Sequence, residues 1–182
     1  AIVFVIFNLY FKKKEVAENT NLQINELKNG EINIDETTAS LIKDIKYTFS
    51  DVKGNKYVLF SKIGKIDINN SDKIFMTDVT ATIYLIDSSP IIITSNFANY
   101  NRSDHETNFF DNVILTHEEH EANSQNLDLS FKNNIANMYN DIIYNKPGTN
   151  LYADRLEIDL LTKNSKIFMD NNFEKIKIIN KY

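Results

Sequence analysis

The residues best suited to chemistry in this chain are three histidines, two in the run His117-Glu118-Glu119-His120 and one at His105. Two histidines three residues apart can share a metal ion when a helix aims both rings the same way. The zinc-peptidase motif has the spacing H-E-x-x-H, whereas this run reads H-E-E-H. An apolar stretch precedes the run and a polar turn follows it, so no long helix is predicted there. We interpret the run as a solvated loop and predict no metal site, leaving a metal-dependent hydrolase as the alternative.

Other patterns give catalysis no support. The chain has no cysteine, which excludes disulfides, cysteine-bound zinc and a thiol nucleophile. It contains neither a glycine-rich phosphate loop nor a G-x-S-x-G motif. The carboxylate pairs Asp154/Glu157 and Glu157/Asp159 are predicted on a solvated strand face. Basic and acidic residues are interspersed and the net charge is −5, which gives no basic footprint for nucleic acid. The sequence therefore predicts a protein that is not an enzyme, needs no cofactor and binds no nucleic acid.

A sequence repeat of about 30 residues occurs in the second half of the chain. Its lead apolar positions Phe97, Leu127 and Leu156 lie 30 and 29 residues apart (127 − 97 and 156 − 127). Each of these residues lies in a stretch of alternating apolar and polar residues, which is the first part of the repeat. The second part follows it and consists of an aromatic residue or Met, then Asp or Asn, then a largely apolar run. Repeats of this length indicate stacked units that cannot each bury an apolar face alone. The pattern directs the search toward a continuous apolar surface.

The elements that carry this surface are predicted to be β-strands. Apolar and polar residues alternate over short runs of about 5–9 residues, with no helix-period segment between them. Asn and Asp clusters replace Gly and Pro, of which there are only 4 and 2, as turn formers. The runs Ile45–Ser50 and Lys56–Ser61 are predicted to form a hairpin. We therefore predict an all-β, antiparallel architecture, either a β-solenoid or a long folded-over sheet with an apolar gutter.

The first residues differ from the rest. The apolar stretch Ala1–Phe11 is followed by Lys12, Lys13 and Lys14. A bilayer span takes about 20 residues, so the stretch is too short by itself. We interpret it as the last part of a transmembrane helix, with an N-terminal β-strand as the alternative. The predicted organisation is a partial anchor over residues 1–14, a polar juxtamembrane linker over 15–44 and a β domain over 45–182.

Several blocks of the β domain match one known pattern. Ile45–Leu59 contains a predicted strand, a D-x-x-G turn and a second strand, and Lys73–Ile83 contains an aromatic residue followed by Asp-Val and a predicted strand. The other blocks are two pairs of predicted strands and one final segment: Ile91–Tyr100 with Phe109–Thr116, Ser124–Phe131 with Met138–Tyr144, and Gly148–Leu156. Together they resemble the LptC family of lipopolysaccharide export proteins, in the form of its α-proteobacterial members. The related LptA proteins share these motifs, but the apolar N-terminal segment without an obvious cleavage site favours LptC.

The resemblance implies a single-span protein of the bacterial inner membrane with a periplasmic β-jellyroll, an open and V-shaped antiparallel sheet. Such a protein accepts lipopolysaccharide from an inner-membrane ABC transporter, which supplies the energy, and passes it to LptA through edge-to-edge sheet pairing. It performs no catalysis.

We predict that alternating apolar positions line a groove for the acyl chains of lipid A. These positions are Phe97, Val113, Leu115, Leu127, Leu129, Phe131, Tyr144, Leu156, Ile158 and Leu160. We predict that the C-terminal strand meets LptA through Lys175, Ile176, Lys177 and Ile178. Alternation alone fits plain core packing equally well, so a structural β-solenoid or adhesin-like module with a dry core remains the alternative.

Overall fold

A computed structural model describes residues 39–51, 53–67, 69–171 and 175–180. The chain divides into two units, Ala1–Ile34 and Asp35–Tyr182, and all of the described residues belong to the second. The elements in this part of the chain are all strands, and none of its segments is a helix able to cross a membrane. The predicted anchor over 1–14 and the linker as far as residue 38 lie outside the described residues. The first strand begins at Ala39, so residues 39–44 belong to the sheet rather than to the linker.

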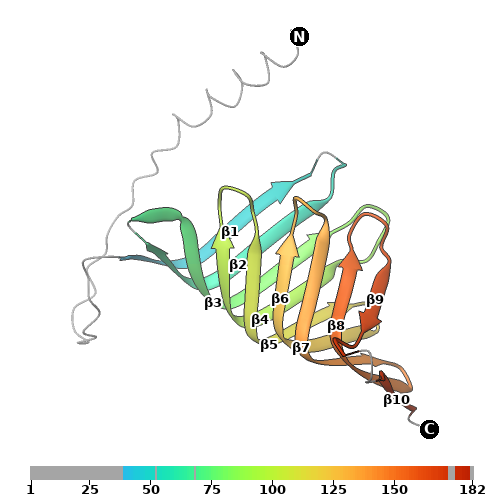
Figure 1. Cartoon of the computed structure of the whole chain (residues 1–182). Coiled ribbons are helices and arrows are strands. Elements are labelled where there is room, and N and C mark those ends of the chain that lie inside the picture. The colour runs from blue at the N-terminus through green and yellow to red at the C-terminus, as the bar shows by residue number, and fades with distance from the viewer. Residues whose placement is uncertain (1–38, 52, 68, 172–174, 181–182) are drawn as a thin grey trace. The chain divides into compact units, whose positions relative to one another are not determined.

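In the part of the chain that the structure describes, ten strands form one antiparallel sheet (Figure 1). Each strand from β1 to β7 pairs with the next in sequence, and β8 pairs on its far side with both β9 and β10. The two edges of the sheet are therefore β1 and the β9/β10 pair. The strands are β1 Ala39–Ser50, β2 Lys56–Asp67, β3 Asn70–Tyr84, β4 Ile91–Asn101, β5 Thr107–His117, β6 His120–Ser130, β7 Ile135–Lys146, β8 Thr149–Asp159, β9 Ser165–Phe168 and β10 Lys177–Asn180.

The all-β, antiparallel, open-sheet prediction is confirmed, but the strands are longer than expected. Strands β1 to β8 span 11 to 15 residues because each one bends near its middle and continues (Figure 1). Each bent strand carries two short alternating runs, which look like separate strands in the sequence. The repeat of about 30 residues is one pair of bent strands, and the sheet is folded over rather than coiled into a solenoid.

The bend divides the sheet into two lobes. Lobe A ends in the turns β1–β2, β3–β4, β5–β6 and β7–β8, and lobe B ends in the turns β2–β3, β4–β5, β6–β7 and β8–β9. A row of buried residues marks the bend, and branched apolar side chains alternate in it with small ones. The row runs Ile45, Ser61, Val79, Ser95, Val113, Ser124, Ile142 and Ala153. Small side chains on every second strand leave room for the two lobes to approach each other.

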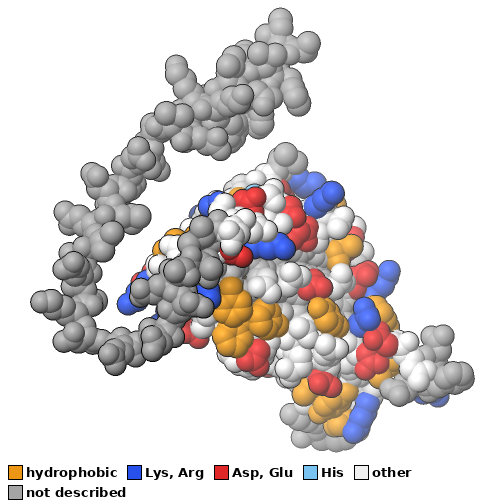
Figure 2. Space-filling model, turned by 60° about the vertical axis from the view of Figure 1, so that its left-hand side comes forward, with side chains coloured by type: hydrophobic (Ala, Val, Ile, Leu, Met, Phe, Trp, Pro, Cys, Tyr) orange, Lys and Arg blue, Asp and Glu red, His pale blue; other side chains and the backbone are white. Residues whose placement is uncertain are grey.

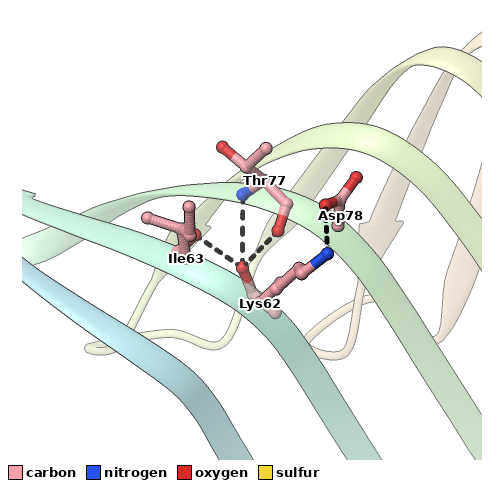
Figure 3. Close-up of polar contacts among 5 residues, drawn as sticks. Lys62, Ile63, Thr77 and Asp78 are labelled. Atoms are coloured by element: carbon pink, nitrogen blue, oxygen red, sulfur yellow. Dashed lines mark hydrogen bonds and ion pairs between the residues drawn. The ribbon is translucent and has the colours of Figure 1, made fainter.

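The serines in this row also form hydrogen bonds with backbone groups that the bend prevents from pairing with the neighbouring strand. The hydroxyl of Ser61 lies 2.7 Å from the carbonyl oxygen of Ile63 and 2.9 Å from that of Thr77, and it accepts the Thr77 N–H at 3.2 Å. Figure 3 shows this arrangement beside the exposed Lys62–Asp78 ion pair. Ser95 and Ser124 each donate in the same way to the carbonyl two residues onward, both at 2.8 Å.

Left-handed backbone angles occur at the bend in four strands, at single residues in β1 and β3 (Asp44 and Asp78, both with φ of 53°) and at pairs of residues in β5 and β7. Asp111 and Asn112 in β5 have φ of 63° and 56°, and Asn140 and Asp141 in β7 have φ of 65° and 60°. At both places the pairing register shifts, so that two residues face one on the neighbouring strand. Such a bulge bends a strand and increases its twist. Asn and Asp tolerate the left-handed region better than other residues with a side chain, which explains why the sequence repeat carries them.

Gly64 in β2 provides space for a neighbouring core side chain. A Cβ added at this position would lie 2.1 Å from Cδ1 of Ile45 and 3.4 Å from Cγ2 of Ile74. We expect Gly64→Val to lower the free energy of unfolding by about 1–3 kcal/mol through overpacking, measured by urea denaturation. Adding Ile45→Ala removes the clashing methyl groups and should recover part of that loss. If the two effects simply add, the clash is not the cause.

The β1–β2 turn depends on the carboxylate of Asp51. It accepts hydrogen bonds from the N–H groups of Lys53 and Asn55, both at 2.9 Å, from the Asn55 side-chain amide at 2.8 Å and from the Tyr57 hydroxyl at 3.2 Å. Burial acts to raise the pKa of Asp51, but these donors outweigh it and the pKa is lowered. A lowered pKa in the folded state stabilises the protein above the unfolded-state value, near pH 3.9, and this stability is lost as the pH falls further.

We therefore expect Asp51→Ala to destabilise the protein by about 1–2 kcal/mol at neutral pH. The difference from the wild type should shrink as the pH falls below about 4. Denaturant titrations of both proteins from pH 7 to pH 2.5 measure this. A difference that stays constant with pH would show that the charge of the carboxylate plays no part.

Candidate functional site

The interior between the two lobes is the candidate site. Its walls are the inward-facing side chains of both lobes, which form one continuous apolar cluster. The interior differs at its two ends, because one end is packed and the other holds a cavity. Hydrophobic side chains also gather in separate patches on the outer surface, set among charged and polar ones (Figure 2).

Aromatic rings close the end near β1 and β2. Phe49 and Tyr57 of lobe A contact Phe131 of lobe B, with ring centroids 4.6 and 4.4 Å apart, and Phe49 stacks on His105 at 4.3 Å. The space left among these residues is only about 10 Å³, so this end of the interior is packed. Burial, helped by the Asp51 carboxylate, raises the pKa of Tyr57 to about 12. The phenol therefore stays neutral throughout the physiological range.

A cavity of about 300 Å³ lies at the other end, between lobe A of β4 to β7 and the β8 strand of lobe B. Its floor and walls are apolar and its rim is polar. The apolar residues are Leu85, Ile91, Leu115, Ala122, Tyr144, Leu156, Ile158 and Leu160, and the polar ones are Ser88, His117, His120, Glu121, Asp159, Lys163 and Ser165. This volume is at the small end of the range for ligand pockets.

The histidine run does not form the solvated loop that its sequence predicts. His117 and His120 are paired residues at the ends of β5 and β6, and only the two glutamates between them form the turn. Both imidazoles are half-buried at the rim of the cavity, where His120 contacts the Tyr144 hydroxyl through Nδ1 and His117 lies 3.4 Å from the Ser88 hydroxyl. His105 is half-buried as well, and its Nδ1 lies 2.8 Å from the Tyr100 hydroxyl. No group of three potential metal ligands occurs among the described residues.

Nine of the ten residues predicted to line a groove face the interior. Six are buried: Val113, Leu115, Leu127, Leu129, Leu156 and Leu160. Phe131, Tyr144 and Ile158 are partly exposed and pack against the core. Five of the nine line the cavity itself, namely Leu115, Tyr144, Leu156, Ile158 and Leu160.

Phe97 lies on the outer face instead. It is paired with Thr77 and Phe110, and its ring contacts those of Phe75 and Phe110 at 5.6 and 5.7 Å. The interior positions of this half of β4 are Ala98 and Tyr100. The bend at Ser95–Asn96 interrupts the alternation of inward and outward side chains in β4. Continuing the alternation through the bend therefore assigns Phe97 to the wrong face. The predicted equivalence of Phe97 with Leu127 and Leu156 is therefore off by one residue.

The C-terminal edge is divided between two short strands. β9 covers Arg155–Ile158 of β8, and β10 covers Thr149–Tyr152. Of the four residues predicted at the partner edge, Lys177 and Ile178 lie in β10, while Lys175 and Ile176 precede it. Ile178 is the most exposed large apolar side chain of the described residues, at 60%. The carboxylates of Asp154, Glu157 and Asp159 are half-buried rather than fully solvated, and that of Glu157 lies 3.8 Å from Lys166.

The prediction missed interior residues in both lobes. Ile74, Met76 and Phe109 are almost completely buried, and Tyr47 and Tyr57 complete the aromatic contacts of the packed end. For Ile74 and Met76 the signal was present, because they alternate with Lys73, Phe75 and Thr77. For Phe109 it was ambiguous, because Phe110 follows directly and either ring fits the inner face.

These features define an open antiparallel β-jellyroll whose apolar interior is packed at one end and hollow at the other. The chain belongs to the LptC family, because the family model "Lipopolysaccharide-assembly, LptC-related" matches residues 1–168. This membership gives it a role in lipopolysaccharide transport.

The fold of this chain is similar to that of a solved structure. LptH from Pseudomonas aeruginosa, described as the LptA-homologous periplasmic component of the conserved lipopolysaccharide transport device, superposes with a TM-score of 0.50 at 8% sequence identity. The match covers 69% of this chain and 95% of that one. No curated protein matches the chain.

Proposed function

We propose that this protein is a non-catalytic, periplasmic carrier that accepts lipopolysaccharide from an inner-membrane ABC transporter and passes it to an LptA-type partner. The observation that supports this most strongly is the apolar cavity between the lobes, in a chain of the LptC family. The N-terminal apolar segment would anchor it to the inner membrane as a single span.

The cavity suits part of a lipid rather than a whole one. Its 300 Å³ equals the share of roughly ten water molecules, enough for a segment of one acyl chain. Each buried methylene contributes roughly 0.8 kcal/mol, so even a partial insertion gives useful affinity. The remaining chains would stay outside or enter as the lobes part. Weak, partial burial favours a carrier that must release its ligand.

The two sheet edges suit a component placed between two partners. A strand edge presents unpaired N–H and C=O groups that another sheet can extend. The β1 edge spans 12 residues, and the opposite edge consists of the short strands β9 and β10. The LptA-type partner would pair with the β9/β10 edge, and lysines 166, 175 and 177 beside it would limit unwanted pairing.

The test is capture of lipopolysaccharide by the protein, followed by native mass spectrometry and by titration. Ile158 is the best position for a substitution, because it lines the cavity and is partly exposed. We expect Ile158→Asp to weaken lipopolysaccharide binding about tenfold, since a carboxylate would have to be desolvated next to the acyl chain. Leu129 is unsuitable, because at 2% exposure a buried charge there would unfold the protein.

Ile143→Asp is the matched control. Ile143 is the same residue type, 37% exposed, on the outer face of the neighbouring β7 strand. It should bind lipopolysaccharide as the wild type does. Equal loss in both variants, or no capture by the wild type, would favour a structural module with a dry core.

A further inference from the structure

A hydrogen bond joins the two lobes at the hollow end of the interior. The Lys163 ammonium, in the β8–β9 turn of lobe B, donates to the carbonyl of Ile86 in the β3–β4 turn of lobe A at 3.0 Å. These residues are 77 positions apart in the chain, and both turns border the cavity, which Lys163 and Leu85 line. The β8–β9 turn therefore reaches over the hollow end of the interior.

The turn is built as a compact unit. The carboxylate of Asp159 accepts the N–H groups of Leu161 and Thr162 at 2.8 and 2.9 Å, and the Lys163 N–H donates to the Asp159 carbonyl at 2.8 Å. Lys163 has a φ of 61°, which aims the chain back toward β9. These bonds lie within the turn and give it a shape of its own.

Two residues of this unit line the cavity opposite lobe A. Lys163 makes the hydrogen bond, and Leu160 is 3% exposed, whereas the next residue, Leu161, is 45% exposed. The Leu160 N–H donates to the Asn134 carbonyl at 2.9 Å, within lobe B. A single solvent-exposed hydrogen bond stabilises only weakly. By contrast, aromatic rings from both lobes interlock at the packed end. The hollow end is therefore where the lobes part most easily.

We propose that the turn Leu160–Asn164 is a lid over the cavity, and that an acyl chain enters when Lys163 leaves Ile86 and Leu160 withdraws. The inference rests on the proposed carrier function, since it concerns access to the same site. The lid would separate loading from release: closed, it retains an inserted chain segment; open, it lets the chain slide out between the lobes.

The absence of cysteine from the chain permits a clean crosslinking test. The double variant Ile86→Cys/Lys163→Cys is bridged by an ethylene-linked bis-methanethiosulfonate reagent, which replaces the Lys163 contact by a reducible covalent link. The probes are the apolar dye N-phenyl-1-naphthylamine and lipopolysaccharide. We expect crosslinking to slow loading of both probes by at least about tenfold, and reductant to restore it.

Ser89→Cys/Glu118→Cys is the control, because these side chains lie 2.9 Å apart next to the rim residues Ser88 and His117 and both belong to lobe A. Its crosslink should leave loading unchanged. Equal loading before and after the Ile86/Lys163 crosslink would overturn the lid, and so would equal slowing in the control pair.

A single substitution tests the lid without crosslinking. Lys163→Asn tolerates the left-handed backbone but is too short to reach Ile86. It should speed dye loading about two- to fivefold, the loss expected for one exposed hydrogen bond. An unchanged rate would overturn the proposal even if the double variant fails to fold. The wild type's capture of lipopolysaccharide is scored separately, so a failed lid leaves the carrier function standing.

Discussion

Phe109→Ala should lower the free energy of unfolding by about 3–5 kcal/mol, the range for removing a large aromatic side chain from a core. Phe109 is 1% exposed and is the largest of the fully buried side chains among the residues that the structure describes. It stands on β5 opposite Leu127 and borders the small gap among Tyr57, Leu129 and the aromatic rings of the packed end. Its loss would leave a void between the two lobes that the bent strands cannot close. Urea denaturation followed by circular dichroism measures the change.

The next residue provides a matched control. Phe110 has the same side chain on the same strand but lies on the outer face against Phe75 and Phe97. Phe110→Ala removes only partly exposed ring contacts and should cost about 1 kcal/mol. Similar losses in the two variants would mean that the interior is not the main source of stability and that the assignment of inner and outer faces is incorrect.

The alternating apolar pattern predicts the class of fold well because burial on one face of a strand imposes a period of two. It predicts the interior correctly wherever a run lies on one side of the bend, as at Leu127–Phe131 and Leu156–Leu160. It fails where the run crosses the bend, as at Phe97, because a bulge adds a residue and changes the face. The asparagines and aspartates that mark the bend are visible in the sequence, but they are equally typical of turns.

The hollow end could not be predicted from alternation, because a filled core and an empty cavity require the same pattern. The rim is formed by residues far apart in sequence, such as Ser88, His117 and Lys163, which only the folding of the sheet brings together. The sequence predicts a loop at the histidine run because a two-residue turn between long strands leaves no signal other than the polar residues themselves. Their half-buried positions follow from the pairing of His117 with His120 at the strand ends.

Substitutions at the bend of β5 should also lower the stability of the protein strongly. Asp111 and Asn112 are exposed and adopt consecutive left-handed angles, so substitutions there act mainly on the backbone. Such a conformation costs roughly 1–2 kcal/mol per residue for ordinary L-residues and more strain for β-branched ones. We therefore expect Asp111→Val/Asn112→Val to lower the free energy of unfolding by about 2–4 kcal/mol in urea denaturation.

Asp111→Gly/Asn112→Gly is the comparison that separates the effect of backbone strain from the loss of the two side chains. It loses the same side chains, including the Asp111 contact with the amide of Asn96 at 3.0 Å, but glycine adopts the left-handed region freely. The glycine pair should be clearly more stable than the valine pair, despite its entropy cost in the unfolded chain. Equal stability would mean that the angle is not under strain and that packing alone bends the sheet. A destabilised valine pair that also loses lipopolysaccharide binding at temperatures where it remains folded would link this bend to the spacing of the two lobes.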